Sequence, residues 1–440
     1  MNCKYYFSIL FSFFIFHFAS AQQTVTVEEV VQMAIQKNYD VRVAQATAAT
    51  QFTDKRFMYG AFLPTFNATG SYLINNNSVR NVAWTGALTN KDGVGSNTQN
   101  PTLLMVWTLF DGTKMFATRQ RLIQLAELGE VNVRNQMMNT AAATLTNFYN
   151  IVRQQEQLKA IQEVMAVNLE RVKLAERKLE VGTGAKPELL QAKVDLNAQR
   201  TLVVQQEILI QQIKDQMNGQ LGFGLPDDYQ LADTIPINGS LTMANIIEGI
   251  ENTNQTVLAA KKNLEIATTA IRENQASRSP VVQLVGAYNY NYNENKLQTS
   301  PFALKESKTF GYNYGVSVTM PILNNMNASR LIAQARATQA RTQAIYDQQK
   351  TLAIVGVRNA FTNYENSKRI LLIQEENILV AKENVVIALA GFRRGIITYI
   401  ELRTANQSLS DAYNQLIAAR FGTKASEIEL MRLKGDLLPK

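Results

Sequence analysis

Three short stretches of the chain alternate between apolar and polar residues, a period of two that predicts β-strands, and a fourth, LLMVWTLF from Leu103, is apolar on both faces. The stretch FGYNYGVSVTM, which begins at Phe310, places aromatic and aliphatic side chains on one face and Gly, Asn, Ser and Thr on the other. Polar, Asn-rich loops at about 75–102 and 293–309 are expected to join the two strands of each pair. The four predicted strands lie at about 64–74, 103–110, 281–292 and 310–320.

These strands have the length and the composition of membrane-crossing strands. About ten residues cross a bilayer when the strand is tilted, and aromatic side chains mark the membrane interfaces. A soluble sheet packed on a helix is the alternative interpretation. The residues expected at the lipid face or its interfaces are Tyr72, Trp107, Tyr288, Tyr290, Tyr292, Phe310, Tyr312 and Tyr314.

Four strands per chain do not close a barrel, which needs about eight or more. An open strand edge is not tolerated in lipid, so several chains would have to share one barrel. Two chains would supply about eight strands and three chains about twelve.

Apolar residues recur every seven positions through most of the remaining chain, as at Leu158, Met165, Val172 and Leu179. This period predicts helices packed side by side in a coiled coil. A run of about 70 residues at about 1.5 Å each gives a helix of about 100 Å, far longer than a bilayer core is thick. The corresponding seam residues of the second half are Leu371, Ile378, Val385, Phe392, Leu402, Leu409 and Leu416.

The two halves of the chain are related by an internal repeat. A shift of 216 residues pairs Pro64 with Pro280, and a shift of 213 pairs Gly182 with Gly395. Each half has the order helix, two strands, long helix, break, long helix. The predicted organisation is a signal peptide at 1–21, a first repeat at 22–218, a linker at 219–240 and a second repeat at 241–440.

The first residues predict export. Lys4, an apolar run and the sequence ASA form the pattern of a secretory signal peptide cleaved after Ala21. A transmembrane anchor is the alternative, but the apolar run is short for one. The only Cys and the only His, Cys3 and His17, lie in this segment. Cys3 precedes the apolar run and is therefore not a lipoprotein cysteine.

Loss of Cys3 and His17 excludes disulfides, Cys/His zinc sites and histidine acid–base catalysis from the mature chain. No catalytic residue, cofactor or metal is predicted. The formal net charge is +8, and removal of Lys4 leaves +7. Because Lys and Arg are spread among Glu and Gln, nucleic acid is not an expected partner. No later stretch is apolar enough for a membrane helix, so any membrane crossing would use strands.

A sharp break interrupts each pair of long helices, at 182–187 and at 395–400. Glycine adopts the positive φ that ends a helix, threonine caps the helix that follows, and proline fits its first turn. Thr183 or Thr398 is expected to serve as such a cap. The sequence GTGAK lacks the spacing of a phosphate-binding loop. The residues expected at these tips are Gly182, Thr183, Gly184, Pro187, Gly395 and Thr398.

Four features resemble the TolC-type outer-membrane efflux protein family. They are TVEEVVQMAIQKNYDVRVAQ near the mature start, GAFLPTFNATGSY, LFDG, and two G-x5-E-x3-A breaks, and the resemblance covers nearly all of residues 24–435. It implies a mainly α-helical homotrimer, with four strands per chain in a shared twelve-stranded barrel of the Gram-negative outer membrane. It also implies a long helical coiled-coil tunnel in the periplasm, and conduction rather than catalysis.

The resemblance further implies a tripartite efflux or type I secretion system. A periplasmic adaptor would dock at the tips, and an inner-membrane pump of the RND, ABC or MFS type would act through it. The alternative from another class is a periplasmic coiled-coil adaptor or structural protein with soluble β-hairpins. An exported hydrolase has no supporting constellation of residues.

In such a trimer Glu188 and Glu401 would form two rings of acids at the entrance. Candidate partners that would hold a gate closed are Arg393, Arg394 and Arg403. Family members commonly carry an aromatic residue where this chain has Leu179, and some carry an acid where it has Thr404. The charged contacts of this entrance are therefore expected to differ from theirs.

Overall fold

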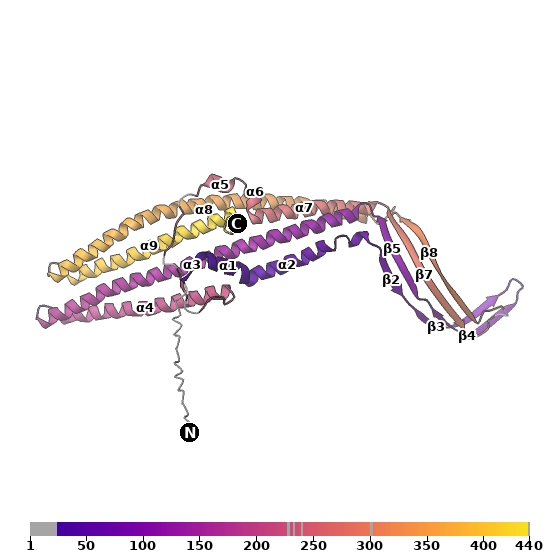
Figure 1. Ribbon diagram of the computed structural model, residues 1–440, viewed down its shortest axis with the longest axis horizontal. Helices are drawn as coiled ribbons and strands as arrows, with labels where there is room; N and C mark the ends of the chain where they lie inside the picture. The colour runs from indigo at the N-terminus through magenta and orange to yellow at the C-terminus, as the bar shows by residue number, and fades with distance from the viewer. Residues whose placement is uncertain (1–23, 227–228, 232–233, 239–240, 300–301, 439–440) are drawn as a thin grey trace, which may run out of the picture. The chain divides into compact units, whose positions relative to one another are not determined.

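The computed structural model describes residues 24–226, 229–231, 234–238, 241–299 and 302–438 (Figure 1). The predicted signal peptide and its cleavage site after Ala21 lie outside the described residues. The chain divides into two compact units, and the two longest helices contribute to both. Unit 1 comprises Met1–Arg42, Met137–Ile246 and Val357–Lys440, and unit 2 comprises Val43–Gln136 and Ile247–Gly356.

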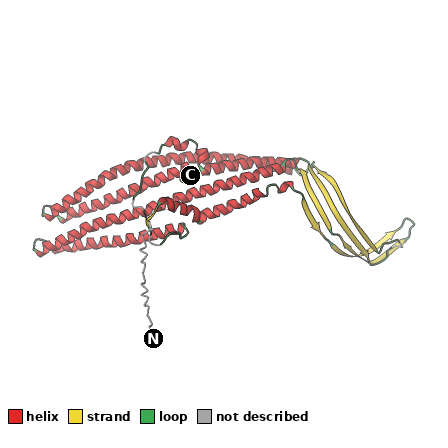
Figure 2. Cartoon of the chain, in the orientation of Figure 1, coloured by secondary structure: helices red, strands yellow, loops and turns green. Residues whose placement is uncertain are grey.

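Helices make up most of the described chain (Figure 2). Two of them, α3 and α8, have 67 residues each and are followed by the shorter α4 and α9. The helices are α1 (Val27–Lys37), α2 (Tyr39–Arg56), α3 (Lys114–Glu180), α4 (Lys186–Gln220), α5 (Met243–Ile247), α6 (Ile250–Thr253), α7 (Gln255–Gln275), α8 (Asn327–Arg393) and α9 (Tyr399–Lys434), with short 3-10 helices at Gly60–Phe62 and Ala276–Arg278.

In unit 1, α3 and α4 form one helical hairpin and α8 and α9 form another. The predicted seven-residue seam is the apolar core of the second hairpin, where the α8 and α9 seam residues named above are all buried. In the first hairpin Val172 and Leu196 are buried, with Met165 and Leu189 packed beside them. The seam residues therefore hold each hairpin together by burying apolar surface between its two helices.

A second core of unit 1 surrounds α1. Thr26 and Glu29 form a capping box that starts this helix, and Val30 and Ala34 are buried against α3, α4 and α9 residues. Two short strands lie beside this core, β1 (Thr24–Val25) and β6 (Gln230–Leu231), which pair in parallel. The repeat pattern did not predict either strand.

Unit 2 contains an antiparallel sheet. Its order is β2-β5-β7-β4-β3, and β8 pairs with the free side of β7. The strands are β2 (Thr65–Thr69), β3 (Tyr72–Val82), β4 (Leu88–Gln99), β5 (Thr102–Phe110), β7 (Val281–Asn295) and β8 (Glu306–Thr319).

These six strands form four continuous runs. Only Gly70 and Ser71 separate β2 from β3, and only Asn100 and Pro101 separate β4 from β5. The ladder continues across both breaks, because Asn100 N–H donates to the Ser71 carbonyl at 2.9 Å and Tyr290 N–H donates to the Pro101 carbonyl at 3.0 Å. Proline has no N–H to donate to a ladder, which accounts for the interruption at Pro101.

The predicted loops at 75–102 and 293–309 are wrong in extent. Most of the first is strand, with only residues 83–87 joining β3 to β4, and the second is shortened from both ends. Asn is depleted in strands in general, which is why these segments read as loops. Here polar side chains pair across the sheet, since Asn75 Nδ2 donates to Ser96 Oγ at 3.3 Å and Thr98 Oγ1 donates to Asn293 Oδ1 at 3.1 Å.

The strand register places all eight predicted aromatic residues on one face of the sheet. Tyr288 lies opposite Tyr312, and Tyr290 lies opposite Phe310. The other four follow from the same register, because side chains alternate between faces along each strand. They are Tyr292, Tyr314, Tyr72 and Trp107. Tyr72 lies opposite Gln99, which in turn lies opposite Tyr292, and Trp107 lies opposite Leu284. We call this side of the sheet the aromatic face.

Candidate functional site

The turn between α3 and α4 ends the first hairpin through backbone hydrogen bonds. Gly182 has a φ of 80°, and its N–H donates to the Leu179 carbonyl at 3.1 Å. The N–H of Thr183 donates to the Lys178 carbonyl at 2.9 Å. This pair of bonds is the Schellman motif, in which a residue with positive φ satisfies the last carbonyls of a helix.

The turn between α8 and α9 repeats the same motif. Gly395 has a φ of 73°, and its N–H donates to the Phe392 carbonyl at 3.2 Å. The N–H of Ile396 donates to the Gly391 carbonyl at 2.9 Å. The glycines at the two tips therefore have the helix-ending geometry that the sequence predicts.

The restart of α9 follows the prediction. Thr398 is its N-cap, with its Oγ1 accepting the Glu401 N–H at 3.3 Å while Glu401 Oε2 accepts the Thr398 N–H at 2.6 Å. These two bonds form a capping box. The hydrogen bond from the Thr398 backbone, followed by that from its hydroxyl, lowers the pKa of Glu401 below its usual range. Glu401 is therefore both a cap and an ionised, exposed carboxylate.

The restart of α4 differs from the prediction. The N-cap is Ala185, which has no side chain that could accept a hydrogen bond, and Pro187 lies in the first turn as expected. Thr183 is not a cap, because its hydroxyl donates backward to the Lys178 carbonyl at 3.3 Å. Glu188 is thus left without a reciprocal partner, and its Oε1 is buried with no hydrogen bond.

Two of the three predicted arginines pair with carboxylates other than Glu188 and Glu401. Arg393 on α8 lies 3.8 Å from Glu170 on α3, and Arg403 on α9 lies 3.5 Å from Asp195 on α4. Arg394 instead lines a groove of about 680 Å³ beside the α8–α9 turn. Within a single chain Arg393 and Arg403 therefore pair with Glu170 and Asp195, and the expected contacts of the arginines with Glu188 and Glu401 around a trimer entrance stay a prediction.

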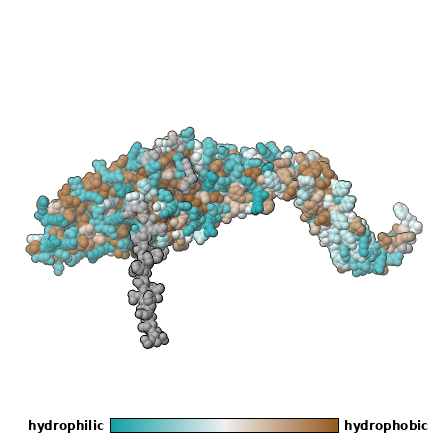
Figure 3. All heavy atoms as spheres, viewed as in Figure 1, coloured by the Kyte–Doolittle hydropathy of each residue, from teal (hydrophilic) through white to brown (hydrophobic). Residues whose placement is uncertain are grey.

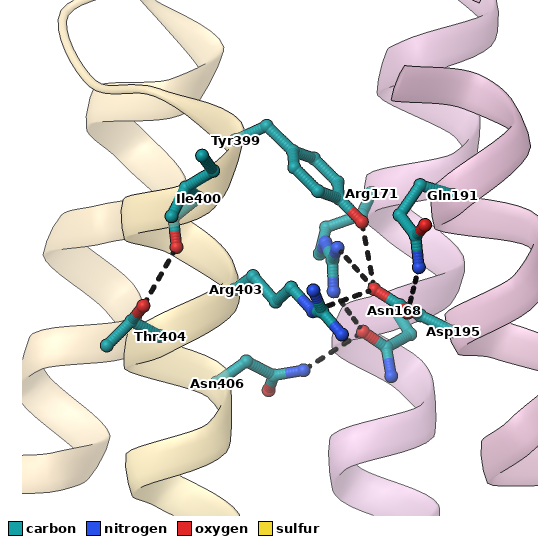
Figure 4. A network of polar contacts seen from close by, with 9 residues as sticks. All are labelled: Asn168, Arg171, Gln191, Asp195, Tyr399, Ile400, Arg403, Thr404 and Asn406. Carbon is teal, nitrogen blue, oxygen red and sulfur yellow. Dashed lines mark hydrogen bonds and ion pairs between the residues drawn. The ribbon is translucent and has the colours of Figure 1, made fainter. Parts of the chain in front are cut away.

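Asp195 is the centre of a polar network between the two hairpins (Figure 4). One of its oxygens, Oδ2, accepts the Tyr399 hydroxyl at 2.8 Å and Arg171 Nη2 at 3.0 Å. The other, Oδ1, accepts Gln191 Nε2 at 3.0 Å. Arg403 approaches from α9, so groups from α3, α4 and α9 converge on one carboxylate.

Arg171 extends this network into the interior of unit 1. Its side chain is 2% exposed, and its guanidinium lies 4.7 Å from the centre of the Tyr399 ring. Its Nη1 donates to Asn168 Oδ1 at 2.6 Å, and the same oxygen accepts Asn406 Nδ2 at 3.0 Å. A buried guanidinium that has lost its water needs such partners, so the network is strongly coupled.

The network shifts two pKa values in opposite directions. Burial alone would raise the pKa of Asp195, but hydrogen bonds from Gln191, Tyr399 and Arg171 outweigh it and lower the pKa. Burial, followed by the hydrogen bond to Asp195, raises the pKa of Tyr399 to about 12. At neutral pH the hydroxyl therefore stays protonated as a donor and the carboxylate stays ionised as an acceptor.

Further polar contacts between α3 and the second hairpin recur every seven residues. Glu156, Glu163 and Glu170 on α3 contact Arg420, Tyr413 and Arg393 respectively. The α8–α9 seam is apolar, whereas this seam is charged and partly exposed. The second hairpin therefore has an apolar core of its own, and it meets the first through these polar contacts together with Val167 and Leu174 of α3, which pack against that core.

Sequence reasoning missed Asp195, Arg171 and Tyr399. A signal was present, because Arg171 directly precedes the seam residue Val172 and Tyr399 directly follows the predicted cap Thr398. A charge beside an apolar seam must be paired when it is buried. The pattern does not say with which group.

In the described part of the chain, no group of three or more His, Cys, Asp or Glu side chains could hold a metal ion. Within the same residues, every helix is too short or too polar for a membrane span.

The model of the outer membrane efflux proteins matches residues 30–222 and 246–436. The chain belongs to the outer membrane efflux protein family. The resemblance inferred from the sequence is thereby confirmed. Membership in this family makes the protein an outer-membrane efflux channel rather than an enzyme, and the interpretation as a periplasmic adaptor is set aside.

Relatives and solved structures agree with this family. Outer membrane protein TolC of Escherichia coli (strain K12) is 20% identical over 436 residues, 96% of this chain and 84% of that protein. TolC of Vibrio cholerae is 23% identical over 298 residues, which are 66% of each chain. The outer-membrane channel OprN has a TM-score of 0.78 at 18% identity, covering 93% of this chain and 90% of its own.

The Campylobacter jejuni CmeC outer membrane channel has a TM-score of 0.76 at 16% identity, covering 93% of this chain and 85% of its own. At such identities the likeness to solved structures establishes the fold, which is mainly helical with an antiparallel sheet.

Proposed function

We propose that this protein is the outer-membrane channel of a tripartite efflux or type I secretion system and that it works as a homotrimer. The observation that carries the proposal is the sheet of unit 2. Its four strand runs have one aromatic face, and its two outer runs, β2 with β3 and β8, have no partner on their outer side in the described part of the chain. Lipid does not tolerate unpaired backbone groups, so such a sheet requires closure by other copies.

Three copies would give a barrel of about twelve strand runs, within the size range of outer-membrane barrels. The exposed residues of β8 fit this arrangement. Tyr312 and Tyr314 are 78% and 80% exposed on the aromatic face, where they would meet lipid. The helices of unit 1 would then lie in the periplasm, and the predicted signal peptide would direct export.

The two halves are proposed to be structural copies that together complete each protomer. The side chain of Asn38 accepts the N–H groups of Asp40 and Val41, and its counterpart Asn254 caps α7. Both tips also end in the same Schellman turn. Matching caps at matching positions support the predicted repeats at 22–218 and 241–440 and the linker at 219–240.

The turns of the two hairpins are proposed to be the docking site for a periplasmic adaptor. The groove beside the second turn is lined largely by apolar side chains, and Ile396 and Ile400 are 73% and 71% exposed. Arg394 and Glu401 lie among its lining residues, so the groove offers one cation and one anion beside an apolar floor. An adaptor helix with a complementary face would fit it, and a pump of the RND, ABC or MFS type would act through that adaptor.

Asp195 and its partners are proposed to hold the second hairpin against the first and so to set the resting width of the entrance. The contacts of Asp195 with Arg171, Tyr399 and Arg403 join different helices. The hydrogen bonds from Gln191 to Asp195 and from Arg171 to Asn168 hold Asp195 and Arg171 in position. Release of the Asp195 contacts would leave the second hairpin, which has an apolar core of its own, free to move as one body.

Glu188 and Glu401 are proposed to favour cations at the entrance, since both are acids in the first turns after the tips. Reversal potentials across planar bilayers in a potassium chloride gradient test this role. The double variant Glu188→Gln with Glu401→Gln should lose cation preference. An unchanged reversal potential would restrict both acids to a role at the helix starts.

The function as a whole is tested by fractionation of cells that express the full chain. The expected result is a heat-modifiable oligomer in the outer-membrane fraction and trimers in detergent by native mass spectrometry. A monomer in the soluble periplasmic fraction would overturn the proposal.

A further inference from the structure

One end of the sheet in unit 2 gathers the junctions with the helices. The register brings the start of β2 beside the end of β5, and the start of β7 beside the end of β8. All four strand runs therefore meet the helices at the same end. In Figure 3 apolar surface gathers where the helices of unit 2 give way to the strands.

An aromatic cluster extends the aromatic face past this end of the sheet. Trp107, on the aromatic face, donates its indole N–H to the Phe62 carbonyl at 2.9 Å. The Phe62 ring meets the Phe116 ring edge to face at 5.2 Å, and the Tyr59 ring lies 6.3 Å from Phe62. Tyr59 and Phe116 are more than half exposed, so the cluster presents its rings to the surroundings.

Arg119 lies at the outer end of this cluster. Its guanidinium is 5.1 Å from the centre of the Tyr59 ring, and its Nη2 donates to the Tyr59 hydroxyl at 3.2 Å. Its Nε is shielded from solvent and has no hydrogen-bond acceptor. In the residues that the structure describes, no carboxylate lies within ion-pair distance of Arg119. An Arg that lacks an anion and faces aromatic rings is suited to bind one.

Arg119 is one of six cations at this end of the sheet. None of the six pairs with a carboxylate in the described ranges, and Arg278 and Arg330 instead donate to Ser329 and Asn327. Of the acids nearby, Asp111 accepts the Met115 N–H at the start of α3, Glu273 accepts the Thr118 hydroxyl and pairs with Arg121, and Asp54 is adjacent to Lys55. The cations are Lys55, Arg56, Lys114, Arg119, Arg278 and Arg330.

Cations farther along the same helices do pair with acids. Arg121 lies 2.9 Å from Glu273, and Lys262 lies 2.8 Å from Glu127. The absence of carboxylate partners is therefore a property of the sheet end and not of unit 2 as a whole. A belt of aromatic rings with unpaired cations beside it matches the boundary between lipid tails and anionic headgroups.

We propose that this end of the sheet binds the phosphate headgroups of anionic phospholipids, with Arg119 as the central contact and Arg56, three residues before Tyr59 in the sequence, as a second cation. The inference rests on the proposed placement of the sheet in the membrane. The acyl chains would cover Phe62, Phe116 and Trp107, and the phosphate would bind the guanidinium of Arg119, which lacks a carboxylate partner among the described residues. The ligand is a membrane phospholipid of the leaflet on the helix side and not free phosphate.

The test uses the indole of Trp107. The sequence has two tryptophans, so Trp84→Phe leaves Trp107 as the only one. The full chain with this substitution is reconstituted in vesicles that contain either brominated phosphatidylglycerol or brominated phosphatidylcholine, and quenching is measured at equal mole fractions. Because one cation near an anionic surface adds about a five-fold preference, phosphatidylglycerol should quench with about five-fold higher apparent affinity.

Adding Arg119→Gln should bring the two lipids close to equal, and Arg56→Gln should lower the preference in part. Arg134→Gln is the matched control, because Arg134 lies on the same helix and already pairs with Glu130 at 3.2 Å. It should keep the full preference. Free inorganic phosphate in excess should not displace the brominated lipid.

Equal quenching by the two lipids in the parent protein would overturn the headgroup site while leaving the membrane placement intact. Absence of quenching by both would instead overturn the placement of the sheet in lipid, and with it the proposed channel. A preference that survives both Arg119→Gln and Arg56→Gln would overturn the assignment of these residues. Oligomers on native gels confirm that each variant has assembled.

Discussion

The hydroxyl of Tyr399 donates to the carboxylate of Asp195 at 2.8 Å, across 204 residues of sequence. Tyr399 is the first residue of α9, and Asp195 lies in the third turn of α4. The bond therefore joins the start of the last helix to the opposite hairpin. It is shared with Arg171, which is almost fully buried. Tyr399, Asp195 and Arg171 thus connect the two hairpins close to their tips.

Removing the carboxylate of Asp195 should loosen the contact between the hairpins. Asp195→Ala leaves Arg171 buried without its anion, and breaking such a buried pair costs about 3 kcal/mol. Tyr399→Phe removes one hydrogen bond and should cost about 1 kcal/mol. Hydrogen exchange of the amides in α4 and α9 measures both effects. Single-channel conductance should rise in both variants, and more in Asp195→Ala than in Tyr399→Phe.

Asp215→Asn is the matched control for this experiment, because Asp215 on the same helix accepts the side chain of Gln211 at 2.9 Å and is not part of the network around Asp195. It should leave exchange near Asp195 unchanged. Slow exchange at α9 in Asp195→Ala would contradict the role of the network.

The contact should also depend on pH at both extremes. The folded pKa of Asp195 is lowered from 3.8, so its stabilisation is present above that value and is lost as pH falls below it. The pKa of Tyr399 is raised from 10.0 to about 12, so its stabilisation is present below pH 10 and is lost as pH rises through this interval. The protection factors of the α9 amides, which divide out the intrinsic pH dependence of amide exchange, should stay constant between these limits and fall beyond them.

Tyr399→Phe should abolish the alkaline change and keep the acidic one. An alkaline change that persists in this variant would assign it to another group.

The uncapped start of α4 can be repaired. Ala185 has φ −97° and ψ 137°, close to the φ −80° and ψ 161° of the cap Thr398. Ala185→Thr should therefore form a capping box with Glu188 and stabilise the start of α4 by about 1 kcal/mol. Thr398→Ala should destabilise the start of α9 by a similar amount. Exchange rates of the first-turn amides measure both changes.

Thr183→Ala is the control, since the Thr183 hydroxyl binds the preceding helix. An effect at the start of α4 as large as that of Ala185→Thr would show that the cap was wrongly placed.

Docking of the adaptor should depend on the backbone of the second tip. A Cβ on Gly395 would meet no atom within 4 Å, so the penalty of a substitution comes from its φ of 73° alone. A β-branched residue is disfavoured there by about 1–2 kcal/mol, whereas Asn adopts this conformation more readily. Gly395→Val should reduce export in a cell-based efflux assay while trimers still form, and Gly395→Asn should be close to the parent. Equal export by both variants would separate the turn from docking.

Much of the fold follows from periodicity in the sequence. Burial of the α8 and α9 seam residues was predictable because a seven-residue apolar period leaves only one stripe to bury. The side of the sheet that carries Tyr288 and Tyr312 was likewise predictable, since alternation allows two faces only. The strands within 75–102 were not predictable, because Asn-rich sequence forms strands only when cross-strand partners satisfy it.

The sequence by itself determined the turns as well, since Gly182 and Gly395 meet a local requirement for positive φ. Only the tertiary structure decided the charged contacts. Arg403 pairs with Asp195 and not with Glu401, because the partner of a charge depends on which helix faces come together. A period along one helix defines its own buried stripe, but the rotation of the neighbouring hairpin about its axis is set by packing between segments about 200 residues apart.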